Sequence, residues 1–205
     1  MATGGSDKDT PITKEKETPS TADKDTPGTA DKAPPSTVTE NPGRGMRLVM
    51  SAMGSKFSSV KHISTSDLEQ WLHTGNDDIV VLDCREPREY DVSHMAESIR
   101  VDWNRVDVNQ LINSLLEREG PAKKKIVCYC SLGFRSGTVA KKIQDFITKK
   151  KEESPPLEVY SLYGSVFKWA NEGRPLVDNS GQKTPFAHPH IFLICGLLNK
   201  AVRKW

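Results

Sequence analysis

The fold is decided by residues 125–147, which read KIVCYCSLGFRSGTVAKKIQDFI. The first five residues are mostly apolar and β-favouring, which predicts a buried strand. Apolar residues then recur at helical spacing, at positions 139, 143, 146 and 147, which predicts a helix. Cys130 therefore lies in a tight loop between a strand and a helix.

This loop has the physical properties that activate a thiol. At such a junction several backbone N–H groups point into one concavity, and the helix N-terminus adds positive potential. Both favour the thiolate, so we expect the pKa of Cys130 to be lowered. Arg135, five residues further on, can fold back and bind an anion over the sulfur. The pattern indicates a nucleophilic cysteine that acts on an oxyanionic substrate.

Length and composition narrow the class of protein. The chain has 205 residues, of which 36% are hydrophobic, which predicts one ordinary domain plus an unfolded part. A net charge of +2 does not favour nucleic-acid binding. Four cysteines are too few for a disulfide framework and fit a reducing compartment. We therefore expect a cytoplasmic protein, with the mitochondrion as the alternative.

No membrane-spanning or secretory segment is expected. No apolar run approaches the roughly 20 residues that cross a bilayer. The first nine residues carry acidic side chains and lack the apolar core of a secretory signal.

Residues 1–57 are predicted to be a disordered tail and linker. From position 10 an eight-residue period rich in Thr, Pro, Lys and Asp recurs, and its repeats contain almost no core-forming side chain. The preferred interpretation of this tail is a solvated spacer. The alternative is a set of proline-directed phosphorylation sites, because Thr10, Thr18 and Thr26 each precede a proline. Residues 46–61 lack acids and faintly resemble an organelle transit segment. A linker or first edge element is the preferred interpretation.

Residues 58–180 are predicted to form one α/β domain. Five short apolar stretches read as strands, at 62–64, 79–82, 98–103, 125–129 and 157–162. Amphipathic helices are expected after the first, third, fourth and fifth of these strands, the first helix capped by Thr65 or Ser66. This alternation predicts a doubly wound, mainly parallel five-stranded sheet, in which ligands bind beyond the carboxyl ends of the strands. Cys130 and the stretch from Asp83 to Arg85 both fall there.

Three stretches of residues 61–178 carry a resemblance to the single-domain rhodanese family of sulfurtransferases. They are VLDCREPREY at 81–90, CSLGFRS at 130–136 and YSLYGSVFKW at 160–169. The chain departs from the family at 93–98, where SHMAES lacks two glycines and a proline. That departure concerns the shape of a local loop and not the nucleophile.

The resemblance implies a persulfide mechanism without a cofactor. Cys130 would take the outer sulfur of a small anionic donor such as thiosulfate and pass it to a thiol, to cyanide or to a protein acceptor. The loop would bind the substrate and stabilise the anionic persulfide. Arg135 would either bind the sulfonate or steady the loop. The predicted loop residues are Ser131, Leu132, Gly133, Phe134, Arg135 and Ser136.

The remaining candidate residues are interpreted as supporting the site or the core. The resemblance places Asp83 and Arg85 near the loop as a bracing ion pair. Cys128 reads as a small core residue, whereas Cys84 could act as a resolving thiol. No set of cysteines and histidines has zinc-ligand spacing, so no metal is expected.

Two other functions remain open. A cysteine phosphatase of the same fold is disfavoured, because those enzymes have five residues between cysteine and arginine and this chain has four. The shorter loop between the cysteine and the arginine suits a sulfur atom better than a tetrahedral phosphoryl group. The other alternative is a non-catalytic binding or regulatory module.

Residues 181–205 form a C-terminal extension, predicted to be a helix docked on the domain. Its apolar run from Ile191 to Leu198 is too short to cross a bilayer. The basic residues and tryptophan that follow make an interfacial helix the alternative.

Overall fold

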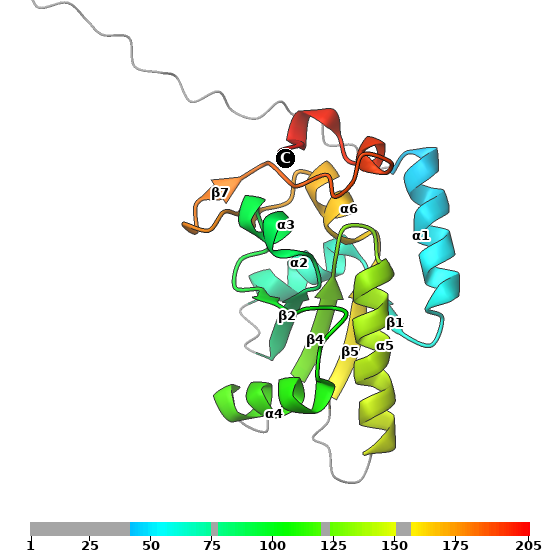
Figure 1. The fold of residues 1–205 in the computed structure, drawn as a ribbon, viewed down its shortest axis with the longest axis vertical. Coiled ribbons are helices and arrows are strands. Elements are labelled where there is room, and N and C mark those ends of the chain that lie inside the picture. The colour runs from blue at the N-terminus through cyan, green and yellow to red at the C-terminus, as the bar shows by residue number, and fades with distance from the viewer. Residues whose placement is uncertain (1–41, 75–77, 120–123, 151–156) are drawn as a thin grey trace, which may run out of the picture. The chain divides into compact units, whose positions relative to one another are not determined.

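The computed structural model describes residues 42–74, 78–119, 124–150 and 157–205. Five strands form one sheet in the order β1-β5-β4-β2-β3, and every neighbouring pair is parallel (Figure 1). The strands are β1 (Lys61–Ile63), β2 (Ile79–Asp83), β3 (Ile99–Arg100), β4 (Lys124–Tyr129) and β5 (Leu157–Leu162). The predicted α/β fold with a parallel five-stranded sheet is confirmed.

A helix follows each of the five strands, and four of these helices match those expected from the sequence. They are α2 (Thr65–His73), α3 (Pro87–Val92), α4 (Val108–Glu119), α5 (Phe134–Lys149) and α6 (Ser165–Asn171). The cap of α2 is Ser64, whose Oγ accepts the N–H of Asp67 at 3.0 Å, so the helix is capped one residue earlier than expected. The short helix α3 was not predicted. It starts with a proline, and Glu86 and Glu89 form a reciprocal capping box around that start.

The sheet separates two hydrophobic cores. Because successive side chains of a strand point to opposite faces, Val127 and Tyr129 of β4 enter one core, whereas Ile126 and Cys128 enter the other. The first core includes residues of α2 and α6, and the second includes residues of α4 and α5. The cysteine loop lies at the carboxyl end of β4, the central strand of the sheet.

An additional helix, α1 (Arg44–Lys56), precedes the first strand. The sequence interpretation assigned these residues to a tail and linker, and that is wrong for the part after Gly43. The apolar side chains Met46, Met50, Met53 and Phe57 follow one another at helical spacing and pack against the two cores. Burial of this stripe stabilises a helix that contains two glycines and is therefore weak on propensity alone.

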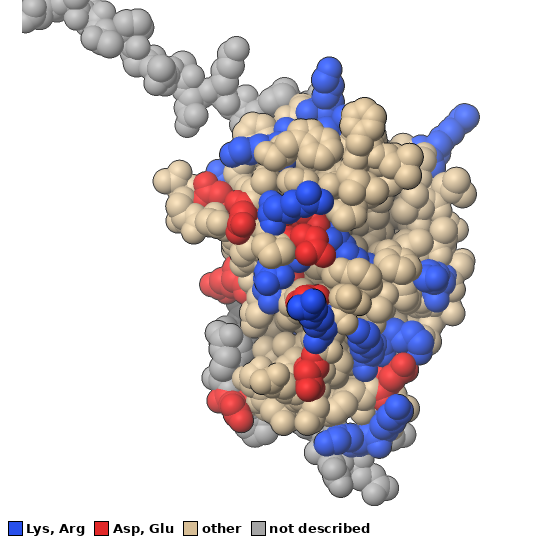
Figure 2. Space-filling model, viewed as in Figure 1, with Lys and Arg blue, Asp and Glu red and all other residues tan. Residues whose placement is uncertain are grey.

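The C-terminal extension contains turns instead of the predicted helix. Strands β6 (Leu176–Val177) and β7 (Lys183–Thr184) pair antiparallel, and the 3₁₀ turns η1 (Cys195–Leu197) and η2 (Lys200–Val202) follow. Prolines at 185 and 189 and a glycine at 196 break any longer helix. The extension nonetheless packs on the domain, since Leu198 is fully buried and the Asn171 side chain hydrogen-bonds the backbone of Leu197 and Asn199. In Figure 2, Lys and Arg side chains project from the end of the molecule where η1 and η2 lie.

Residues 1–41 of the predicted tail lie outside the described residues. Among the residues that are described, no helix has the length and apolarity needed to traverse a lipid bilayer.

Candidate active site

Cys130 directly follows the last residue of β4 and opens the loop that leads into α5. Its side chain lies inside this loop, and the Gly133 N–H donates to Cys130 Sγ at 3.1 Å. Gly133 is the N-cap of α5 and has φ +111°, a left-handed conformation that side chains disfavour. The glycine therefore lets the chain turn tightly enough to aim a backbone amide at the sulfur.

Two serine hydroxyls complete the surroundings of the sulfur. Ser136 Oγ lies 3.6 Å from Cys130 Sγ, and Ser165 Oγ lies 4.0 Å from it. The same Ser165 hydroxyl accepts the Cys130 N–H at 3.1 Å, so the first residue of α6 also holds Cys130 in place. The third stretch of the sequence resemblance thus contributes directly to the site.

The site lowers the pKa of the Cys130 thiol. Burial favours the neutral thiol, but the Arg135 guanidinium and the hydrogen bonds from Ser136 and Gly133 favour the thiolate and outweigh burial. The arrangement can therefore hold a nucleophilic sulfur, or an anionic group attached to it.

Arg135 is held by a carboxylate that the sequence interpretation did not single out. Its Nη1 donates to Glu89 Oε2 at 2.6 Å, and its Nη2 donates to Glu89 Oε1 at 2.8 Å. Ser131 Oγ donates to Glu89 Oε1 at 2.7 Å and accepts from Arg135 Nη2 at 2.8 Å. Glu89 is thus the centre of a buried network that fixes two residues of the cysteine loop.

The position of Glu89 follows from the start of α3. Its Oε2 also accepts the Glu86 N–H at 3.1 Å, which is half of the capping box. The sequence EPRE at 86–89 carried this signal, because a proline in the first turn and a glutamate three residues after the cap mark a helix start. Read that way, it would have placed a carboxylate beyond the end of β2.

Glu89 remains ionised despite being buried. Burial opposes its charge, but Arg135, His190 and Ser131 stabilise the carboxylate and hold its pKa well below the usual range. His190 Nδ1 lies 3.2 Å from Glu89 Oε1. His190 belongs to the C-terminal extension, so that extension reaches the network around the cysteine loop.

Asp83 and Arg85 form the predicted ion pair. Arg85 Nη2 donates to Asp83 Oδ2 at 2.6 Å, and both side chains are fully buried. Arg85 Nη2 also donates to the Ser93 carbonyl at 2.6 Å, which ties down the loop after α3. The Tyr129 hydroxyl donates to Asp83 Oδ2 at 2.6 Å, so the pair supports the residue that precedes Cys130.

Helix α1 covers the cysteine loop. A Cβ atom built on Gly133 would lie 3.5 Å from the Met53 side chain, so Met53 packs directly on the turn of the loop. The Phe57 ring packs on the start of α5 and meets the Phe134 ring edge to face at 6.1 Å. Cys130 is only 2% exposed.

The structure gathers most of the predicted site residues around one sulfur. Gly133 and Ser136 contact Cys130, and Ser131 and Arg135 join the Glu89 network. Phe134 points away and is 44% exposed, and Leu132 packs partly into the first core. Cys84 and Cys128 are both buried beside Cys130 in the second core, and burial raises the pKa of Cys84 well above its usual value.

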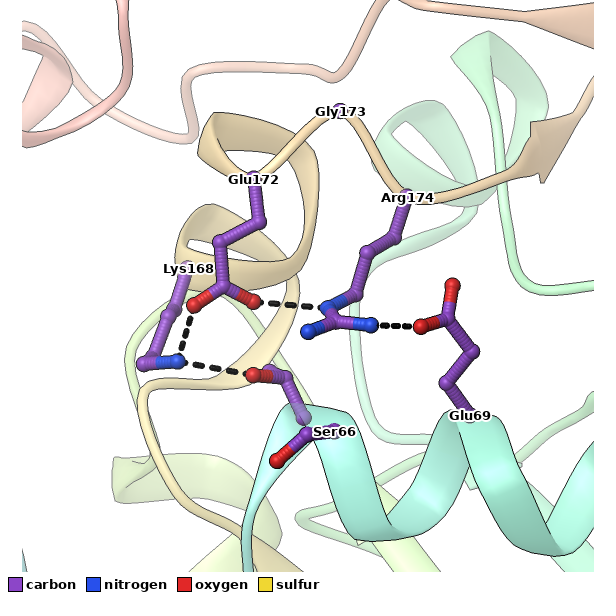
Figure 3. A pocket seen from close by; sticks show the side chains of 7 residues that line it. Ser66, Glu69, Lys168, Glu172, Gly173 and Arg174 are labelled. Atoms are coloured by element: carbon purple, nitrogen blue, oxygen red, sulfur yellow. Dashed lines mark hydrogen bonds and ion pairs between the residues drawn. The ribbon is translucent and has the colours of Figure 1, made fainter. Parts of the chain in front are cut away.

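A cavity of about 420 Å³ lies elsewhere, between α2 and α6 (Figure 3). Its charged lining side chains pair with one another. Lys168 contacts Glu172, and Arg174 contacts both Glu172 and Glu69. Cys130 does not line it. In the described part of the chain no group of three or more His, Cys, Asp or Glu side chains is arranged to hold a metal ion.

Comparisons with known proteins agree with this architecture. Residues 64–172 match the model of the rhodanese-like domain. No curated protein sequence matches the chain.

The chain is also similar to three solved structures. A yeast protein tyrosine phosphatase of the rhodanese family is 17% identical, over 54% of this chain and 83% of its own, with a TM-score of 0.45. An As-Sb reductase from Leishmania major is 19% identical, over 60% and 91%, with a TM-score of 0.49. A thiosulfate sulfurtransferase from Pseudomonas aeruginosa is 18% identical, over 67% and 23%, with a TM-score of 0.44. Similarities of this size do not choose one chemistry over another.

Proposed function

The chain belongs to the rhodanese-like domain family, and from this premise we propose that it is a sulfurtransferase that works through a persulfide on Cys130. The observation that carries the proposal is the environment of the sulfur. The pKa of the Cys130 thiol is lowered, and its sulfur accepts hydrogen bonds from a loop N–H and a serine hydroxyl at the start of a helix. Those groups stabilise a thiolate before the reaction and a persulfide anion after it.

The proposed cycle has two displacements. The Cys130 thiolate attacks the outer sulfur of thiosulfate, a sulfur–sulfur bond forms, and sulfite leaves with the electron pair of the bond that breaks. The acceptor, a thiolate or cyanide, then attacks the outer sulfur of the persulfide and releases the Cys130 thiolate. The partners are therefore a small anionic donor and a thiol, cyanide or protein acceptor. The thiolate must stay reduced between cycles, which fits a reducing compartment such as the cytoplasm or mitochondrial matrix.

Arg135 acts in this proposal as a positioning residue. Both of its terminal nitrogens are bound to Glu89, so the guanidinium favours the thiolate through its charge and not through a direct bond to the donor. The same engagement argues against a phosphatase, in which the loop arginine has to clamp the phosphoryl oxygens. The loop is also narrow for a phosphoryl group, because only four residues separate Cys130 from Arg135.

The second candidate function is a non-catalytic binding module. The observation that favours it is the burial of Cys130 beneath α1, because a donor needs access to the sulfur. Catalysis requires that this cover open or that the donor enter beside it.

The deciding experiment incubates the full chain with thiosulfate and records its intact mass. We expect a gain of one sulfur atom on Cys130 that cyanide removes as thiocyanate. The Cys195→Ser variant should behave like the native chain, because Cys195 lies in η1, away from the site. Protein that stays unmodified, or a Cys130→Ser variant that transfers sulfur equally well, would refute the proposal. Faster hydrolysis of an aryl phosphate than thiosulfate turnover would favour a phosphatase, and neither reaction would favour the binding module.

A further inference from the structure

Two chain segments that meet at one end of the domain combine basic charge with exposed apolar side chains. Residues 42–66 and 179–205 contain four Lys or Arg residues each and no Asp or Glu. The segments touch, because the Gly45 backbone packs against the Leu197 side chain, and Figure 1 shows the start of α1 beside η1. Six of the eight large hydrophobic side chains that are exposed in the described residues belong to these segments.

The most exposed of these side chains lie on a turn. Phe192 is 85% exposed and Leu193 is 88% exposed. The N–H groups of Ile194 and Cys195 both donate to the Ile191 carbonyl, at 3.2 and 3.1 Å, which closes the turn. On its two sides, His190 contacts Glu89, and Leu198 is buried in the core. The fold therefore holds two large apolar side chains out in solvent instead of letting them collapse onto the domain.

Exposed basic side chains belong to the same two segments. Figure 2 shows Lys and Arg projecting from this end, with the visible acidic patches further down. Arg44, Arg47, Lys200 and Lys204 are exposed, and none of them forms an ion pair with another described residue. The basic apolar surface consists of Arg44, Arg47, Leu48, Phe192, Leu193, Lys200, Lys204 and Trp205.

We propose that the basic apolar surface docks the domain on an anionic lipid bilayer. Lys and Arg side chains bind anionic headgroups, while large apolar and aromatic side chains enter the boundary between headgroups and acyl chains. Exposed apolar surface rimmed by charge marks an interaction site. A protruding turn fits a deformable bilayer better than a protein partner, whose interface requires a complementary hollow. No Asp or Glu is among the residues of this surface, which favours contact with an anionic membrane.

The surface is separate from the proposed sulfur chemistry. None of its members lies in the cysteine loop or in the Glu89 network. A membrane result therefore neither supports nor refutes the persulfide proposal, and the two experiments have different readouts.

The test is sedimentation of the full chain with phosphatidylcholine vesicles that contain or lack phosphatidylserine. We expect binding only with phosphatidylserine, and weakening by added salt. Phe192→Ser/Leu193→Ser and Lys200→Glu/Lys204→Glu should each reduce the partition coefficient about tenfold or more. These side chains are exposed, so the variants should keep the unfolding midpoint of the native chain.

Matched controls lie on other faces. Leu72→Ser removes an exposed apolar side chain from α2, and Lys149→Glu reverses a charge at the far end of α5. Both should bind vesicles like the native chain. The proposal is overturned by absence of binding to phosphatidylserine vesicles, or by equal losses in the controls. A dimer that the Phe192→Ser/Leu193→Ser variant dissociates, without vesicle binding, would instead identify an interface between copies.

Discussion

Arg135 and Glu89 form a doubly hydrogen-bonded ion pair between the cysteine loop and the start of α3, with N···O distances of 2.6 and 2.8 Å. The Glu89 side chain is fully buried, and that of Arg135 is 8% exposed. Bidentate pairs of this kind fix orientation as well as contributing energy. The loop that surrounds the sulfur is therefore positioned by a helix that follows a different strand.

Loss of one partner of this pair should destabilise the protein more than loss of both. Glu89→Gln leaves a buried guanidinium without its counter-charge and should lower the free energy of unfolding by about 3 kcal/mol. Glu89→Gln/Arg135→Met removes the other charge as well and should recover part of that loss. Urea denaturation of the native chain, both single variants and the double variant gives the coupling energy. Additive losses would show that the two groups do not stabilise each other.

The same carboxylate should make stability depend on acid pH. The folded-state pKa of Glu89 lies below its unfolded-state value of about 4.3. Its contribution is therefore complete above about pH 4.3 and declines as the pH falls below that value, because the unfolded chain then takes up a proton more readily. The difference in unfolding free energy between the native chain and Glu89→Gln should shrink between about pH 4.3 and pH 3. A constant difference over this range would contradict the assignment.

The sequence was sufficient for the sheet and for the loop that holds Cys130, because both have local signals. Apolar runs such as Ile79–Leu82 mark buried strands, and the glycine-containing loop after Cys130 marks a strand-to-helix turn. The role of Glu89 was not predicted, because it depends on a contact with Arg135, 46 residues away in the sequence. Only the fold brings those two positions together.

The two ends of the domain were harder to predict for different reasons. Helix α1 has an apolar stripe at helical spacing, but its glycines and serines and the preceding polar tail made it resemble a linker. The C-terminal run from Ile191 to Leu198 splits its side chains between the core and solvent within a few residues. Such a division follows from a turn, and hydrophobicity alone does not distinguish it from a short helix.

Arg135 should also control the ionisation of the nucleophile. It provides the largest interaction favouring the Cys130 thiolate, so its loss should raise the thiol pKa. Glu89→Gln/Arg135→Met is the variant to use, because the single arginine variant leaves Glu89 buried and unpaired. The pH profile of alkylation at Cys130, followed by peptide mass spectrometry, reports the pKa. Glu89→Gln alone serves as the control and should not raise it.

Met53 should limit access to Cys130. Met53→Ala removes the side chain that packs on the turn at Gly133 and should accelerate alkylation of Cys130 severalfold at constant pH. Because Met53 is half-buried, the cost in stability should be about 1–2 kcal/mol, below that of a fully buried methionine. Leu48→Ala is the control, since Leu48 lies on the same helix and is 74% exposed. Equal alkylation rates in the native chain and Met53→Ala would mean that reagents reach the sulfur by another path.

Gly137 and Gly54 should respond oppositely to alanine. Both are helical, so alanine brings a gain of about 1 kcal/mol in helix propensity at either position. At Gly54 the new Cβ would meet Tyr163 at 3.6 Å, an ordinary contact, and Gly54→Ala should stabilise the protein by about that amount. At Gly137 it would lie 2.5 Å from Phe57 Cδ2, and displacement of this buried ring should cost about 1–3 kcal/mol, more than the gain. Thermal unfolding of the two variants measures the sign of each change in stability. Stabilisation by Gly137→Ala would show that α1 does not pack on the start of α5 as described.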